Sequence, residues 1–265
     1  MNKAASGQSL SIGLSLPFTE VSALQELRDI PECFELLELS GELVSQAKQL
    51  HNDNELLHEF DFFNFRDLLP ASLTGQLTTA GTSIVNEYKK QLRELFARAH
   101  ECRAEVVSID PDWEVLANDP ERLKIFEDVL RSTAGDRQYY NITLAIAVRV
   151  PHLGALQLSE SVQLLHKLPN YHVKLVLDIN PHELLKSQID WQEELKLFRF
   201  STAYVRFCYP SELGNKLLYK HIEPIVQVLR SWKQDIPIYI APSGRANLYE
   251  LSEMVRELTN ESTEK

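Results

Sequence analysis

The sequence predicts a single α/β domain over residues 1–265 with the fold of a (β/α)8 TIM barrel. Eight strand-like runs alternate with helix-like stretches, which indicates parallel strands joined by right-handed crossovers. A chain of 265 residues with 44% hydrophobic content suits one large core. No glycine-rich turn follows the first run, which disfavours an open doubly wound sheet. The ends, 1–8 and 260–265, are expected to fray.

The predicted strands share a high content of aliphatic and branched residues. They lie at 11–16, 33–39, 56–62, 104–109, 141–150, 172–179, 202–207 and 236–241. In the fifth run, large residues alternate with small ones. The large face is expected to pack against outer helices, and the small face to fill the barrel interior and end in Arg149 at the mouth.

Helices are predicted where apolar residues recur every three or four positions, most clearly at 83–102 and 248–258. Asp119 before Pro120 predicts a capped helix start, and Asn247 with Glu250 resembles a capping box. Pro224 is expected to mark a start or kink within a helix at 215–233. Residues 64–83 lack a pattern and predict a long loop at the mouth, which could be a lid or a passive connection.

Composition narrows the function classes. The net charge of −11 and the lack of a basic run argue against a nucleic-acid partner. No apolar stretch is long enough to span a membrane, and Met1–Leu10 has no signal-peptide core. The three widely spaced cysteines predict reduced thiols rather than disulfides or a zinc site. We therefore expect a cytoplasmic protein that acts on a small molecule, and a homo-oligomer is left open.

Several segments resemble the xylose isomerase-like TIM barrels, the superfamily of sugar-phosphate isomerases/epimerases and endonuclease IV. SIGLSL at 11–16 and FELLELSG at 34–41 are similar to the first two strands of that family. Residues 77–111 resemble its third helix and fourth strand, and VKLVLDINPH at 173–182 resembles its sixth strand. The resemblance implies an active site at the carboxyl ends of the strands. It also implies a divalent metal held by Glu, Asp, His and Glu from the fifth to eighth strands.

This chain departs from that ligand pattern. The sixth strand keeps Asp178, and His182 follows one residue later than in the family. At the family's ligand positions on the fifth, seventh and eighth strands, this chain has Arg149, Arg206 and Ala241. One carboxylate and one histidine are too few ligands for a tight transition-metal site. We therefore predict that the family metal is absent, that no other cofactor is needed, and that the arginines supply the positive charge.

The candidate catalytic residues are Asp178, His182 and Glu38. Asp178 and His182 suit acid–base chemistry, because a carboxylate among charges can have a shifted pKa and histidine titrates near neutrality. Glu38 is inward by parity with Phe34 and Leu36. The alternatives stay open: Asp178 and Glu38 could pair with arginines, and His182 could cap the following helix.

The candidate substrate-binding residues lie at or just beyond strand ends. Arg149, Arg206 and Arg245 could hold an anion through their guanidinium forks, and Ser243 lies in a helix-entry turn of the kind that seats phosphate. The alternative for each arginine is a structural salt bridge with Asp110, Asp178 or Glu38. Asp110 stands where the family has a His-Pro histidine. Trp113 could stack on a sugar face, or it could simply pack within its loop.

Two functions follow. The first is a metal-independent enzyme, isomerase/epimerase-like, in carbohydrate metabolism, acting on a small, polar, anionic sugar-type metabolite. In it, Asp178 or Glu38 would abstract a proton and an arginine would stabilise the enediolate. The second is a catalytically inactive barrel that serves as a binding or scaffold protein. An endonuclease is disfavoured, because that chemistry needs a metal cluster and a basic face.

Overall fold

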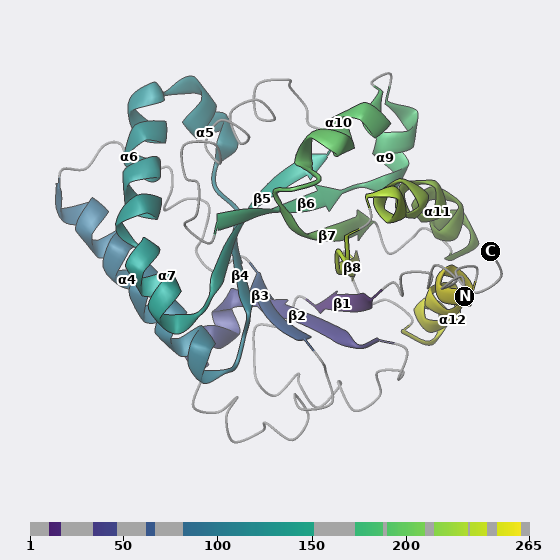
Figure 1. The fold of residues 1–265 in the computed structure, drawn as a ribbon, viewed down its shortest axis with the longest axis horizontal. Coiled ribbons are helices and arrows are strands. Elements are labelled where there is room, and N and C mark those ends of the chain that lie inside the picture. Colours follow the sequence, from purple (N-terminus) through teal and green to yellow (C-terminus); the bar gives the residue numbers. More distant parts are fainter. Residues whose placement is uncertain are drawn as a thin grey trace, which may run out of the picture.

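A computed structural model describes residues 11–16, 34–46, 62–66, 82–150, 173–187, 190–209, 215–232, 234–242 and 248–260. Eight parallel strands close into a barrel in the order β1 to β8, each paired with its neighbours and β8 with β1. The strands are β1 Ile12–Leu16, β2 Leu36–Ser40, β3 Phe62–Arg66, β4 Val106–Ile109, β5 Thr143–Val150, β6 Val173–Ile179, β7 Thr202–Tyr209 and β8 Ile238–Pro242. The predicted TIM-barrel fold is confirmed (Figure 1).

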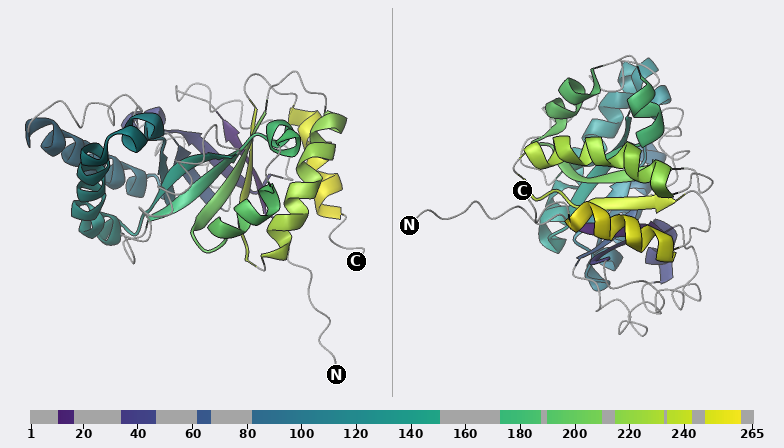
Figure 2. Two further views of the ribbon diagram at one scale, coloured as in Figure 1. Left: turned by 90° about the horizontal axis from the view of Figure 1, so that it is seen from above. Right: turned by 90° about the vertical axis from the view of Figure 1, so that its right-hand side faces the viewer.

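The described helices pack on the outside of the barrel. They are the 3-10 helix η2 Gly41–Gln46, then α4 Thr82–Glu101, α5 Trp113–Asn118, α6 Pro120–Ser132, α7 Ala134–Tyr140, α9 Pro181–Lys186, α10 Trp191–Phe198, α11 Asn215–Ser231 and α12 Leu248–Asn260. Figure 2 shows α4, α6 and α7 gathered at one end of the molecule and α11 beside α12 at the other. No helix in the described part of the chain is long and apolar enough to cross a membrane.

Helix starts and faces follow from the sequence. Asp119 caps α6 as predicted, its carboxylate accepting from the backbone N–H groups of Glu121 and Arg122 at 3.1 Å each. In α4, the predicted face is buried at Tyr88, Leu92, Phe96 and Ala99. Pro224 lies inside α11, which continues on both sides of it. The predicted Asn247–Glu250 capping box lies outside the described residues and side chains.

The third strand runs past its predicted end, and most of the predicted loop, 67–81, lies outside the described residues. The strand was expected at 56–62 and the loop at 64–83, but β3 runs from Phe62 to Arg66 and α4 begins at Thr82. The polar residues in FFNFR caused the error, because Asn64 and Arg66 resemble loop residues. In the barrel they face Glu38 and Ser40 in the register of β2 with β3, so they belong to a polar interior.

The strands alternate between two environments. Outward residues such as Leu144, Ile146 and Val148 pack in the main core with the helices. Inward residues form a second, smaller cluster inside the barrel, made of Leu36, Val106, Ala145, Val176, Tyr204 and Tyr239. The predicted alternation in the fifth strand is therefore confirmed. Buried polar side chains also line the interior: Ser15, Glu38, Asn64, Ser108 and Arg206.

Candidate active site

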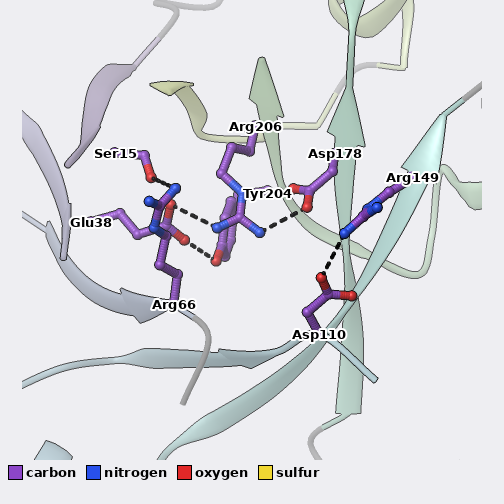
Figure 3. Close-up of polar contacts among 8 residues, drawn as sticks. All are labelled: Ser15, Glu38, Arg66, Asp110, Arg149, Asp178, Tyr204 and Arg206. Carbon is purple, nitrogen blue, oxygen red and sulfur yellow. Dashed lines mark hydrogen bonds and ion pairs between the residues drawn. The ribbon is translucent and has the colours of Figure 1, made fainter. Parts of the chain in front are cut away.

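Strand register brings three of the predicted site residues into one row at the carboxyl ends of β5, β6 and β7. Arg149 pairs with Asp178, and Asp178 pairs with Arg206. Side chains at paired positions of parallel strands point to the same side of the sheet, so the three reach the mouth together. Glu38 joins them from β2, across the barrel interior (Figure 3).

Arg206 is the centre of the site. Its Nε donates to Asp178 Oδ1 at 2.6 Å and its Nη2 donates to Asp178 Oδ2 at 2.9 Å, which is a bidentate fork. Its Nη1 donates to Glu38 Oε2 at 3.4 Å. The Arg206 side chain is only 2% exposed, so the barrel interior contains a permanent cation shared by two carboxylates.

Glu38 is held from two sides. The Tyr204 hydroxyl of β7 donates to Glu38 Oε1 in a short hydrogen bond, while Arg206 binds Oε2. Tyr204 in turn packs edge-on against Tyr239 of β8, with ring centroids 5.0 Å apart. The Tyr239 hydroxyl accepts from Asn64 Nδ2 at 2.9 Å. Glu38 is fully buried, and its polar contacts reach β7 on the far side of the barrel.

Burial and charge set the protonation states in this network. Burial raises the pKa of Asp178 above its ordinary value; the Arg206 guanidinium opposes this, and the Glu38 and Asp110 carboxylates add to it. Burial and the Glu38 charge raise the pKa of Tyr204 well above 10, so the hydroxyl stays a donor. Burial alone would lower the pKa of Arg206. The negative charges of Asp178 and Glu38 outweigh this effect and raise the pKa above its ordinary value.

A second pair lies further out. Arg149 Nη2 donates to Asp110 Oδ2 at 3.1 Å, and these side chains are 73% and 27% exposed. On the other side of the mouth, Arg66 Nη1 donates to Ser15 Oγ at 3.1 Å. Arg149 and Arg206 thus adopt the salt-bridge arrangement that was the alternative to an anion clamp.

The formal charges in this view balance. Figure 3 draws three arginines (Arg66, Arg149, Arg206) and three carboxylates (Glu38, Asp110, Asp178), which sum to zero when all are ionised. These six side chains therefore carry no surplus of positive charge for an anion. Ser243 and Arg245, the remaining candidates for anion binding, lie outside the described residues.

His182, which was predicted to take part in acid–base chemistry with Asp178, packs against a neighbouring helix. It is the second residue of α9, and its ring packs against His221 of α11 with centroids 4.9 Å apart. The alternative, that His182 caps this helix, is wrong: the Asn180 side chain accepts from the Glu183 backbone N–H at 3.3 Å. Asn180 is the better cap because it precedes the first turn and its side chain reaches forward to an N–H group that has no partner within the helix.

Trp113 is a packing residue in this structure. It is 4% exposed in the main core, and its Nε1 donates to the Ala147 carbonyl oxygen at 2.7 Å. This matches the packing alternative rather than a stacking platform. Burial followed by the Asp178 charge raises the pKa of Cys208, on β7, to about 12, which favours the protonated thiol over the nucleophilic thiolate.

Tyr204, Tyr239 and Arg66 were missed by the sequence reasoning. A signal for Tyr204 was present, because it lies two residues before Arg206 and so shares its face of β7. Arg66 was hidden by the misplaced third strand. Asn64 lies in the barrel interior, where its Oδ1 accepts from the Val106 backbone N–H at 3.2 Å.

The residues present do not fit the divalent metal of the resembled family. Both oxygens of Asp178, the one ligand kept in place, are bound by Arg206. The described residues contain no group of three or more histidine, cysteine, aspartate or glutamate side chains that could hold a metal ion. A dication beside Asp178 would also lie next to a buried guanidinium, with which it would repel strongly.

Comparison with known proteins gives the fold. No protein-family model and no curated protein matches the sequence. Among solved structures, the chain is similar to D-psicose 3-epimerase from Clostridium cellulolyticum H10, with a TM-score of 0.71 and 10% identity over 96% of this chain and 98% of that one.

Two further solved structures agree. 3-Keto-D-glucoside 4-epimerase from E. coli has a TM-score of 0.66 and 14% identity over 95% of this chain and 99% of that one. A D-tagatose 3-epimerase-like protein has a TM-score of 0.70 and 14% identity over 96% of this chain and 99% of that one. The resemblance to sugar isomerase/epimerase barrels is therefore confirmed at the level of the fold: the chain has the barrel of these sugar epimerases along nearly its whole length.

Proposed function

We propose that this chain acts on a small, polar, sugar-type metabolite at the barrel mouth by isomerase/epimerase-like proton transfer, without a divalent metal. The observation that carries the proposal is the Arg206 fork on Asp178, which puts a fixed cation beside a carboxylate at the strand ends. Similar folds in the solved structures belong to sugar epimerases. Fold alone does not carry chemistry, so the argument rests on the residues.

Asp178 is the proposed proton acceptor. Its side chain is 13% exposed, the most accessible of the three central charged groups. Its raised pKa brings the carboxylate closer to the range in which a general base works efficiently at neutral pH. Each of its oxygens accepts one bond from Arg206 and keeps further lone-pair capacity for a substrate proton.

Arg206 supplies the charge that a metal would supply in the resembled family. Three of its five N–H groups bind Asp178 and Glu38, and the guanidinium keeps its charge at every working pH. A fixed cation stabilises negative charge that develops on an adjacent enediolate, and it needs no reorganisation during the reaction. Arg149, which is largely exposed, is the proposed contact for substrate oxygens.

Deuterium wash-in tests the reaction. The protein is incubated in D2O with a panel of ketoses, aldoses, sugar phosphates and hydroxy acids, and exchange of the proton beside the carbonyl is followed by NMR. We expect exchange for at least one class, and a loss of roughly 100-fold or more in Asp178→Asn. Asp136→Asn is the matched control, because Asp136 lies in α7 and pairs with Arg93. Exchange that survives Asp178→Asn unchanged would remove the proposed base.

Metal content is measured on the same preparation. Untagged protein purified without chelator should contain metal far below one equivalent, and EDTA should leave any exchange rate unchanged. Stoichiometric zinc or manganese, or loss of exchange on chelation with recovery on adding metal back, would contradict the proposal.

A non-catalytic binding barrel is the second candidate. The observation that favours it is that the carboxylates of the site are already paired with arginines. Glu38 and Asp178 are both bound by Arg206, and Asp110 is bound by Arg149, so each carboxylate already has a partner. Thermal stabilisation by a member of the same panel, without deuterium exchange or product, would select this function over catalysis.

A further inference from the structure

A buried chain of contacts, the first between aromatic rings and the rest polar, runs from β8 through β7 and β2 to Asp178 at the mouth. Tyr239 supports Tyr204, Tyr204 donates to Glu38, and Arg206 joins Glu38 to Asp178. Glu38 was predicted as a catalytic carboxylate, yet it is 0% exposed and both its oxygens are bound inside the barrel. A carboxylate with this burial does not touch substrate.

We infer that Glu38 is a positioning residue that sets the protonation of Asp178 through their shared Arg206. The inference rests on the proposed function for its role in a reaction, but the coupling itself is a property of the side chains alone. It reassigns Glu38 from proton transfer to control of the group that transfers the proton.

The geometry gives the mechanism. Arg206 presents Nε and Nη2 to Asp178 at 2.6 and 2.9 Å and turns Nη1 to Glu38 at 3.4 Å. One guanidinium charge is therefore divided between two carboxylates in a water-poor interior, where charges interact more strongly than in bulk water. Asp178 feels less of the cation than it would alone, and it also feels the negative charge of Glu38. The Asp110 carboxylate, which follows β4 and pairs with Arg149 of β5, raises the pKa of Asp178 as well and stays the same in the variants compared below.

Tyr204 keeps Glu38 in this position. Burial and then the Glu38 charge raise the pKa of the Tyr204 hydroxyl, so it remains a donor to Oε1. That bond withdraws part of the Glu38 charge from Arg206. Without the Tyr204 hydroxyl, Glu38 would compete harder with Asp178 for the guanidinium.

Two variants should therefore move the pKa of Asp178 in opposite directions. Glu38→Gln removes the negative charge and leaves the guanidinium to Asp178, so the pKa of Asp178 should fall by roughly one unit, a usual effect of one nearby charge. Tyr204→Phe leaves Glu38 charged and bound by Arg206 alone, so the pKa of Asp178 should rise. Glu42→Gln, just beyond β2 and exposed, is the control and should leave it unchanged.

The measurement is a carbon-13 NMR pH titration of protein labelled at the aspartate carboxyl carbons, with the Asp178 signal assigned by its absence in Asp178→Asn. Circular dichroism confirms that each variant is folded. An Asp178 pKa that is unchanged or higher in Glu38→Gln overturns the inference. Should Glu38→Gln not fold, an Asp178 pKa that is unchanged or lower in Tyr204→Phe overturns it instead.

This titration needs no ligand, so it separates the inference from the proposed function. A protein without turnover can still show the coupling, which would leave the inference standing and remove the enzyme proposal. Where turnover is found, the acid limb of the kcat/KM profile should move to lower pH in Glu38→Gln, together with the NMR pKa. A purely structural role for Glu38 would lower stability without shifting either quantity.

Discussion

Replacing Arg206 with methionine would remove the shared cation while keeping most of the side-chain length. Two carboxylates, one of them 0% exposed, would lose their partner. Removing one member of a buried ion pair costs roughly 3–5 kcal/mol, because the remaining charge is left desolvated. Arg206 is 2% exposed, so solvent screening does not reduce this figure much. We therefore expect the free energy of unfolding to fall by about 3–5 kcal/mol at pH 7, a large part of the 5–15 kcal/mol typical of a domain.

Urea unfolding followed by circular dichroism measures this loss. The matched control is Arg149→Met, whose side chain is 73% exposed and should cost at most about 1 kcal/mol. A triple variant, Glu38→Gln with Asp178→Asn and Arg206→Met, should recover part of the loss, because no buried charge is then left unpaired. If Arg206→Met costs no more than Arg149→Met, or if the triple variant recovers nothing, the buried cation does not hold these carboxylates as described.

Three further variants test the fold and its pH dependence. In Gly13→Ala, the new Cβ would overlap Leu36 Cβ and lie 2.6 Å from the Leu36 carbonyl oxygen, so β1 must move away from β2. Differential scanning calorimetry should show a loss of about 1–3 kcal/mol in stability, and an unchanged Tm would contradict this packing. Asp119→Ala should cost about 0.5–2 kcal/mol in urea unfolding by removing the α6 cap, with Asp128→Ala as the mid-helix control. The pKa of His221 is lowered by burial and by His182 and Lys186, so the fold should lose stability as the pH falls below the ordinary histidine value. His221→Asn should reduce the fall in Tm between about pH 7 and pH 5; an equal fall in both proteins would refute this contribution.

The sequence patterns typical of strands and helices were enough to predict most of the fold. The alternation of large and small residues at 143–149 predicted both faces of β5, and Asp119 predicted the start of α6. The third strand was misplaced because its inward residues, Asn64 and Arg66, are polar. A polar strand interior is unusual for a TIM barrel, so hydrophobic pattern alone could not identify it.

The candidate site was predicted in part. Asp178 and Arg206 could be placed together, because each lies near the end of its strand and parallel strands end at the same face. The sequence could not decide between an anion clamp and internal pairing, since that depends on side-chain direction and distance. The place of His182 could not be predicted for a related reason: it lies in the first turn of α9, where its ring contacts His221 of α11, and the sequence shows only its nearness to Asp178 along the chain.

The most direct test of the central claim is a crystal structure of the untagged protein soaked in manganese, with anomalous diffraction recorded for that ion. The account predicts no anomalous peak within coordination distance of Asp178, and a guanidinium of Arg206 that still forks onto both of its oxygens. An anomalous peak bound to Asp178, with Arg206 turned away from the barrel axis, would contradict it.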